Sequence, residues 1–186
     1  MSHIPNQIHQ TWNSALLPEQ GGTLHAAFHV ATDGMLLEAR NAERVALAVT
    51  VSRGSLVVEA PEDHIVLDVE DTYGVQFGGV HDLHITFGDF GTRIYLDGYQ
   101  AFACATNICP SKYAQTGVFH CANEAHIGVE RLECFPEAWT SERIQGSVPV
   151  PQPDIEFAAA YLADKDVKTL HGVTDGLSLI HISEPT

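Results

Sequence analysis

The chain has 186 residues and 45% of them are apolar, which is enough for one ordinary domain with a buried core. Its 24 Asp and Glu against 9 Lys and Arg give a formal charge of -15 at pH 7. Such a charge repels phosphate backbones and anionic membranes, so neither a nucleic acid nor a membrane is expected as a partner.

Alternation of apolar and polar residues predicts a series of short strands. Residues 1–21 precede the first clear pattern and are expected to form an N-terminal arm. Residues 24–30 and 44–51 then alternate with a period of two, which is typical of half-buried strands. Shorter runs of the same kind follow at residues 35–39, 55–60, 64–70, 99–105, 118–121 and 126–132.

Glycine turns interrupt residues 78–102, where the alternation is most regular. Apolar and polar residues alternate on both sides of a turn at 88–91. A second turn is predicted at Asp97-Gly98, because a two-residue primed turn needs positive φ, which Asp tolerates and Gly permits freely. Roughly ten strands spaced about 8 to 12 residues apart predict an all-β fold, an antiparallel sandwich or jelly roll over residues 22–142.

The composition changes after residue 142. Prolines at the alternate positions 149, 151 and 153 favour an extended linker over residues 143–155. Residues 156–176, with a short helix at 162–170, are expected to be the truncated start of a second module. Residues 177–186, LSLIHISEPT, resemble the translation of a sequencing-library adapter, so we expect this tail to be artificial.

Neither a membrane-spanning segment nor a secretory signal is predicted. No apolar run approaches the roughly 20 residues that cross a bilayer. The first twelve residues lack the basic and apolar regions of a secretory signal. A cytoplasmic location is therefore expected, without excluding secretion.

With these strands and turns in place, residues 81–102, HDLHITFGDFGTRIYLDGYQAF, resemble the concanavalin-like, laminin-G-type sandwich modules. The resemblance extends loosely over residues 22–137, and its most specific part is a Tyr-x-Asp-Gly sequence at residues 95–98. Modules of this family occur as accessory domains of carbohydrate-active enzymes. They bind sugars, bind proteins or buttress a neighbouring domain, so the resemblance predicts fold better than function.

A sandwich followed by a proline linker and a further module is similar to the organisation of multidomain exo-glycosidases. These include β-fructosidases of the levanase and invertase type, and sialidases. The resemblance implies an N-terminal fragment of a glycoside hydrolase that acts on fructan-type bonds through its missing part. Carbohydrate and the missing downstream domain are the expected partners. The alternatives are a sialidase accessory domain, a non-enzymatic lectin-like module that binds a glycan or protein, and a structural spacer.

No complete catalytic set is expected in this chain. Glycoside hydrolysis requires two carboxyl groups flanking the bond, and Glu133-Cys134 reproduces only the Glu-Cys dipeptide that carries the acid in β-fructosidases. The Trp-x-Asn-Asp-Pro and Arg-Asp-Pro motifs of that family are absent from the sequence, and so are the Asp box and the Arg-Ile-Pro of sialidases.

The sequence contains ligands for two candidate metal sites, and neither site is favoured. The candidate zinc ligands are Cys104, Cys109, His120, Cys121, His126 and Cys134, whose spacing contains no Cys-x-x-Cys pair. Buried free thiols are expected instead, with a disulfide between Cys109 and either Cys104 or Cys121 left open. The candidate calcium ligands are Asp63, Asp82 and Asp89, but scattered loop aspartates are typical turn formers. No cofactor is expected, and calcium is left open.

Five side chains form the candidate carbohydrate-binding surface, namely His25, His29, His84, Arg93 and Tyr95. They alternate with the apolar positions of their strands, so they are expected to line one exposed face of the sandwich. Imidazole and aromatic groups there could stack on sugar rings or hydrogen-bond their hydroxyls. The other interpretation is that they are ordinary solvent-facing or interdomain residues, because antiparallel sheets are commonly polar on one face.

Overall fold

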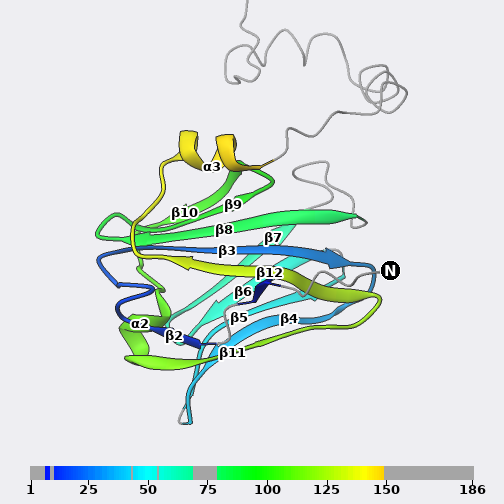
Figure 1. Ribbon diagram of the computed structural model, residues 1–186, viewed down its shortest axis with the longest axis horizontal. Helices are drawn as coiled ribbons and strands as arrows, with labels where there is room; N and C mark the ends of the chain where they lie inside the picture. The colour runs from blue at the N-terminus through cyan, green and yellow to red at the C-terminus, as the bar shows by residue number, and fades with distance from the viewer. Residues whose placement is uncertain (1–6, 9–10, 43, 54, 69–78, 149–186) are drawn as a thin grey trace, which may run out of the picture. The chain divides into compact units, whose positions relative to one another are not determined.

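Two six-stranded sheets pack face to face in the computed structural model (Figure 1). The structure describes residues 7–8, 11–42, 44–53, 55–68 and 79–148, and all of them belong to one compact unit, Met1–Pro149. The predicted second module, the helix at 162–170, the alternating prolines and the tail at 177–186 lie outside the described residues.

Sheet A contains the strands from both ends of the sandwich and from the glycine-rich middle. Its strands lie in the order β1 (Gln7–Ile8), β12 (Ile127–Phe135), β3 (Gly21–Val30), β8 (Val80–Gly88), β9 (Gly91–Leu96) and β10 (Tyr99–Cys104). Neighbouring strands are antiparallel, except that β1 runs parallel to β12.

Sheet B faces sheet A across the core. Its strands lie in the order β2 (Thr11–Asn13), β11 (Thr116–Cys121), β4 (Gly34–Arg40), β5 (Val45–Ser52), β6 (Ser55–Ala60) and β7 (Asp63–Asp68). Two short helices, α2 (Pro110–Tyr113) and α3 (Ser141–Ser147), complete the described fold. The predicted all-β antiparallel sandwich is confirmed. No helix in the described part of the chain has the length and apolar character needed to cross a membrane.

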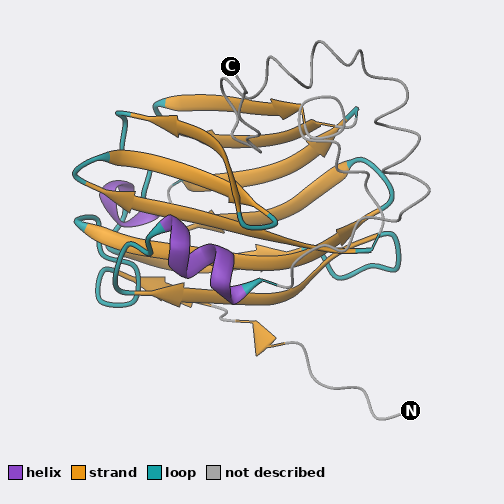
Figure 2. Cartoon of the chain, turned by 90° about the horizontal axis from the view of Figure 1, so that it is seen from above, coloured by secondary structure: helices purple, strands orange, loops and turns teal. Residues whose placement is uncertain are grey.

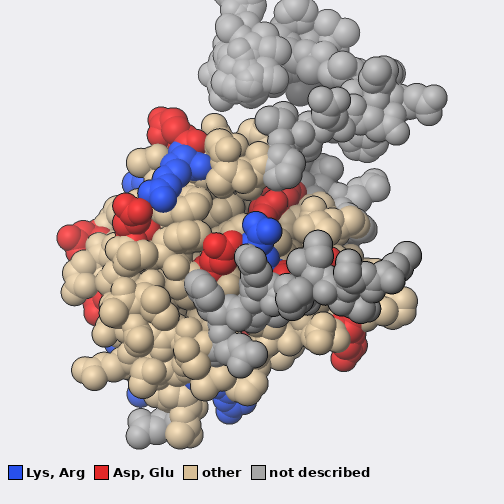
Figure 3. All heavy atoms as spheres, viewed as in Figure 1, with Lys and Arg blue, Asp and Glu red and all other residues tan. Residues whose placement is uncertain are grey.

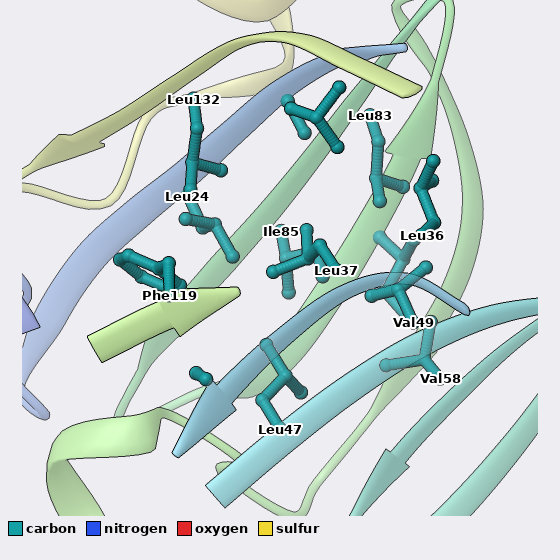
Figure 4. Close-up of a cluster of buried hydrophobic side chains, with 14 of the residues drawn as sticks. Leu24, Leu36, Leu37, Leu47, Val49, Val58, Leu83, Ile85, Phe119 and Leu132 are labelled. Atoms are coloured by element: carbon teal, nitrogen blue, oxygen red, sulfur yellow. The ribbon is translucent and has the colours of Figure 1, made fainter. Parts of the chain in front are cut away.

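The apolar positions of the two sheets meet in one core (Figure 4). Leu24 of β3, Ile85 of β8 and Leu132 of β12 are buried on the inner side of sheet A. Leu37 of β4 and Val49 of β5 are buried on the facing side of sheet B. Since side chains alternate across a strand, the residues between these positions face outward, so the polar members of each alternation lie on the outer faces.

The predicted turn at Asp97-Gly98 is confirmed. Their φ angles of 50° and 88° are both positive, as a type I′ turn requires. The Asp97 carboxylate also accepts a hydrogen bond from the Asp82 backbone N–H at 2.9 Å. A Cβ at Gly98 would lie only 2.8 Å from the Val148 side chain. The turn therefore closes the β9–β10 hairpin and lets the chain after α3 pass close to it.

Segments on both sides of the predicted 22–142 sandwich are built into it. Where the sequence predicts a separate arm, β2 pairs with β11, and Trp12 and Leu17 are fully buried. Where it predicts the boundary and the linker, α3 forms, and its Ile144 is fully buried. Thr140 caps α3 by accepting a hydrogen bond from the backbone N–H three residues on, at 3.3 Å. Such short segments owe their structure to packing, which periodicity does not reveal.

Candidate functional site

The predicted carbohydrate-binding residues lie on the outer face of sheet A. Cross-strand pairing places His25 of β3 beside His84 of β8, and His84 beside Tyr95 of β9. His29 and Arg93 lie towards opposite ends of the same face. The structure therefore brings three of the five residues into one row and separates the other two.

A segment that follows β12 covers part of this face. We call residues 136–147, which include α3, the strap. The centroid of its Trp139 ring lies 5.9 Å from the centroid of the His84 ring, and its Ser141 Oγ lies 3.0 Å from the Tyr95 hydroxyl oxygen. His84 and Tyr95 are fully buried and His25 is only 9% exposed, so the expected exposure is wrong for these three residues. The cause is the return of the chain over the sheet, with α3 lying against it (Figure 2).

Few polar contacts anchor the strap. The Thr23 hydroxyl of β3 donates to the Glu137 carbonyl at 2.7 Å and accepts from the Trp139 backbone N–H at 2.9 Å. Within the strap, Arg143 pairs with the Glu137 carboxylate at 2.9 Å, and its guanidinium lies 4.2 Å from the centroid of the Trp139 ring. Ile144 supplies a buried apolar contact. The hydroxyl of Thr23 is thus the main polar link between strap and sheet.

The region beneath the strap, which we call the covered half, consists of His84, Thr86 and Tyr95. The His84 ring stacks on His25, with centroids 4.2 Å apart and planes 12° apart. Neither ring nitrogen of His84 has a hydrogen-bond partner among the described residues, and the Thr86 hydroxyl also has none there. Burial, together with the charge of His25, lowers the pKa of His84 to about 3 against the opposing effect of Asp82. His84 is therefore neutral near pH 7.

The rest of the site, which we call the open half, surrounds His25. It consists of His25, His29, Asp82, Glu130, Arg131 and Glu133. His25 Nε2 lies 2.7 Å from Asp82 Oδ1, and His25 Nδ1 lies 3.8 Å from Glu133 Oε1. Burial resists ionisation of Asp82, but the hydrogen bond from His25 and the charges of His25 and Arg131 outweigh it and lower the Asp82 pKa. Asp82 is thus an ionised acceptor held in a defined position.

A β-bulge in β12 supplies two of these side chains. Pairing with β3 shifts register between Val129 and Arg131, so the adjacent residues Glu130 and Arg131 are both exposed. Glu130 Oε1 lies 3.2 Å from His29 Nδ1, but this nitrogen makes no hydrogen bond, so the contact is electrostatic only. Arg131 Nε lies 3.6 Å from Glu133 Oε1. Acidic and basic side chains accordingly lie together near the middle of the face in Figure 3.

The open half offers groups that recognise hydroxyls. Its carboxylates accept hydrogen bonds, and the Arg131 guanidinium, whose side chain is 54% exposed, donates them. Ala27 pairs with both Asp82 and Arg131, so a small side chain lies between these two charged ones. Glu133, the residue that matches the acid dipeptide, contacts His25 and Arg131. The arrangement is suited to polar recognition.

Arg93 lies apart from the open half. Its guanidinium stacks over the Phe90 ring at 4.3 Å from the centroid, beside the β8–β9 turn. Arg93 is exposed, as predicted, but contributes to a different end of the face.

The candidate metal ligands are not assembled. Within the described ranges, no group of three or more His, Cys, Asp or Glu side chains is arranged to hold a metal ion. None of the four cysteines, all of which lie in the described ranges, forms a disulfide, so neither disulfide left open by the sequence is present. Burial raises the pKa of Cys109 and Cys134 to about 12 and that of Cys121 to about 11. These three thiols are therefore protonated and unreactive near neutral pH.

Sequence reasoning missed Glu130 and Arg131 and gave Asp82 and Glu133 other roles. The available signal was the pair of adjacent charged residues, Glu130-Arg131, inside an otherwise alternating strand. Two successive polar residues between buried ones are what a bulge produces. By contrast, no local pattern connects Asp82 with His25, since their pairing depends on the register of β3 against β8.

No known protein-family model matches the sequence, and no curated protein does. Solved structures do match the fold. The NanB sialidase from Streptococcus pneumoniae has a TM-score of 0.57 and 12% identity, over 80% of this chain and 28% of that chain. A Trypanosoma rangeli sialidase has a TM-score of 0.51 and 13% identity, over 68% of this chain and 22% of that one. The botulinum neurotoxin serotype D binding domain has a TM-score of 0.54 and 10% identity, over 73% and 38%.

These likenesses concern the fold alone, because the identities are far below the level at which function transfers. The chain spans between about a fifth and two fifths of the length of the proteins it matches. In each of the three proteins the part that matches this β-sandwich is a fraction of a longer chain. A sandwich of this fold thus occurs in sialidases and in a neurotoxin binding domain, and here its outer face carries a network of charged and imidazole side chains.

Proposed function

We propose that this chain is a carbohydrate-binding accessory module of a multidomain glycoside hydrolase, with the open half as its binding surface. The observation that carries the proposal is the network of His25, Asp82, Arg131 and Glu133 on the outer face of sheet A, in which the partly exposed Asp82 and Glu133 carboxylates are acceptors and the Arg131 guanidinium is a donor. Sugar hydroxyls both donate and accept, so they can pair with each of these groups. The likeness to parts of two sialidases supports a role beside a glycosidase domain.

The charges of the open half favour a neutral glycan. Three carboxylates, those of Asp82, Glu130 and Glu133, accompany one guanidinium, and the whole chain carries a formal charge of -15. An acidic sugar would meet a net negative surface, which opposes its approach. A neutral polyhydroxyl glycan incurs no such repulsion. Fructan is one such glycan, so the fructan-type parent stays a prediction, although none of the three structures compared above is a β-fructosidase.

The proposal is tested on the full chain with an array of neutral oligosaccharides, including inulin and levan fragments, alongside sialylated ones. Binding is then quantified by titration calorimetry. We expect neutral glycans to bind and Arg131→Ala to weaken the binding at least tenfold, because a charge-assisted hydrogen bond contributes about 1.5 to 3 kcal/mol.

Arg93→Ala is the matched control, since it removes an exposed arginine of the same face outside the open half. It should change affinity less than twofold. Preference for sialylated glycans would support the sialidase alternative, and equal losses in both variants would remove the open half as the site. Binding to no glycan would overturn the proposal and leave a buttress or spacer.

A second candidate is a non-enzymatic lectin-like module. The likeness to a toxin binding domain favours it, because that fold region belongs to a protein described as a binding domain. The two candidates share the same surface and differ in what the parent chain does. Hydrolysis of the bound glycan by the intact parent protein would decide for the accessory module.

A further inference from the structure

A layer of polar atoms without partners lies between the strap and sheet A. Among the described residues, neither nitrogen of His84, nor the Thr86 hydroxyl, nor Nε1 of Trp139 has a hydrogen-bond partner, and all four atoms are buried. A buried donor or acceptor that loses water without gaining a partner destabilises the closed state. Such atoms are rare in protein interiors and here they gather under one segment. The contact between strap and covered half is therefore a weak one.

His84 contributes two of these four atoms. It is fully buried, stacked on His25 on one side and within 5.9 Å of the Trp139 ring. Of these two ring neighbours, His25 belongs to β3 and Trp139 to the strap, so displacement of the strap would bring water to His84. A proton on His84 needs water or a carboxylate, and neither reaches its nitrogens while the strap is closed.

We propose that the strap is an acid-released cover of the carbohydrate-binding face, closed over neutral His84 and opened when His84 takes up a proton. The inference rests on the proposed function for the identity of the face, but not for the movement itself. Opening would join His84, Thr86 and Tyr95 to the open half and so enlarge the surface available to a glycan.

Charged and titratable groups from each neighbouring element bear on this proton. His25 of β3 opposes it, and Asp82 of β8 favours it. Glu133 of β12 is directed to the far nitrogen of His25, and the Tyr95 hydroxyl of β9 is engaged by Ser141. From the strap itself, Arg143 places a further positive charge over the Trp139 ring. The one favourable carboxylate near His84 is already hydrogen-bonded to His25.

The sign of the pH effect follows from linkage. His84 has a pKa of about 3 when covered and should return to about 6.5 when the strap is open. Between these values only the open state binds the proton, so the ratio of open to closed strap rises up to tenfold for each unit that pH falls. From pH 7 to pH 4.5 the ratio should rise roughly 70-fold. Above pH 7 it should stay constant.

Hydrogen exchange of residues 137–147 in the full chain tests the movement without any sugar. After correction for the intrinsic pH dependence of exchange, protection of the strap should fall more than tenfold between pH 7 and pH 5. Protection of β3 and β8 should be retained. In a Trp12→Phe variant, Trp139 is the remaining tryptophan, and its emission should shift to longer wavelength over the same range while far-UV circular dichroism stays constant.

His84→Phe, which keeps a ring but cannot titrate, should abolish the acid transition of the strap, and His84→Gln provides a second variant if the first misfolds. His120→Phe is the matched control, since His120 is an exposed histidine on sheet B. An acid transition that persists in both His84 variants, or that occurs together with global unfolding, would overturn the inference. Failure of glycan binding at every pH with a normal strap transition would count only against the proposed function.

Discussion

His25 and His84 are neighbours in one row of sheet A, yet their ring nitrogens differ in their partners. His25 lies between two carboxylates in the open half, at 2.7 Å from Asp82 and 3.8 Å from Glu133. His84 has no partner for either nitrogen among the described residues and lies beneath Trp139. The same residue type thus belongs to a network of charged side chains in one half and is a neutral ring, unpartnered within the described part of the chain, in the other. The difference between the two histidines comes from what covers each strand position and not from the residue type.

The largest effect is expected from the link between strap and sheet. Thr23→Val removes the hydroxyl that serves both the Glu137 carbonyl and the Trp139 N–H, and both backbone groups are then left without that partner. We expect a loss of about 2 to 4 kcal/mol in the free energy of unfolding if the strap stays closed, and less if it opens and becomes hydrated. Urea unfolding at pH 7 measures this loss.

Thr86→Val is the control for that substitution. Thr86 is also a buried threonine of the outer face, but its hydroxyl has no partner among the described residues. Its replacement should be neutral or stabilising, because a buried unpartnered group is removed. If both variants lose the same stability, then packing rather than hydrogen bonding holds the strap, and the two halves of the face differ less in their polar contacts.

A smaller effect is expected in the open half. Asp82→Asn removes the charge that His25 faces, and we expect a loss of about 1 to 2 kcal/mol at pH 7. Because the pKa of Asp82 is lowered in the folded protein, its contribution is fully present above the unfolded value of about 3.9 and is lost as pH falls through the lower folded value. The difference between variant and wild type should therefore shrink below about pH 4.

Glu59→Gln provides the comparison for Asp82. Glu59 also lies 2.7 Å from a histidine, His64, but both side chains are more than half exposed, at 53% and 60%. Water competes for these groups, so no measurable loss is expected. Equal losses at Glu59 and Asp82 would show that partial burial of the open half does not strengthen its pairs.

The strands could be predicted from the sequence because one buried side imposes a period of two. The turn at Asp97-Gly98 could be predicted because positive φ restricts the residue type. Only part of the open half could be predicted from the sequence. His25 and His29 follow from alternation, but the bulge that exposes both Glu130 and Arg131 interrupts it. The covered half was misjudged for a physical reason. A polar outer strand position has the same sequence pattern whether water or a strap lies over it, and here the strap is more than 50 residues from His84.

The smallest effect is expected where the open half meets solvent, at the pair of His29 and Glu130. Their atoms are 3.2 Å apart, closer than those of His25 and Glu133, yet Nδ1 of His29 makes no hydrogen bond and the Glu130 side chain is 45% exposed. Judged by distance alone, this contact would be stronger than the one between His25 and Glu133. Its greater exposure to solvent makes it the weaker of the two. Glu130→Gln should therefore lower the free energy of unfolding in urea by less than about 0.5 kcal/mol. Raising the salt concentration from 0.05 to 0.5 M should remove even this loss, because mobile ions screen exposed charges within a few ångströms. A salt-independent loss above 1 kcal/mol would mean that the bulge holds Glu130 in a buried pair, and the boundary of the open half would then have to be drawn beyond His29.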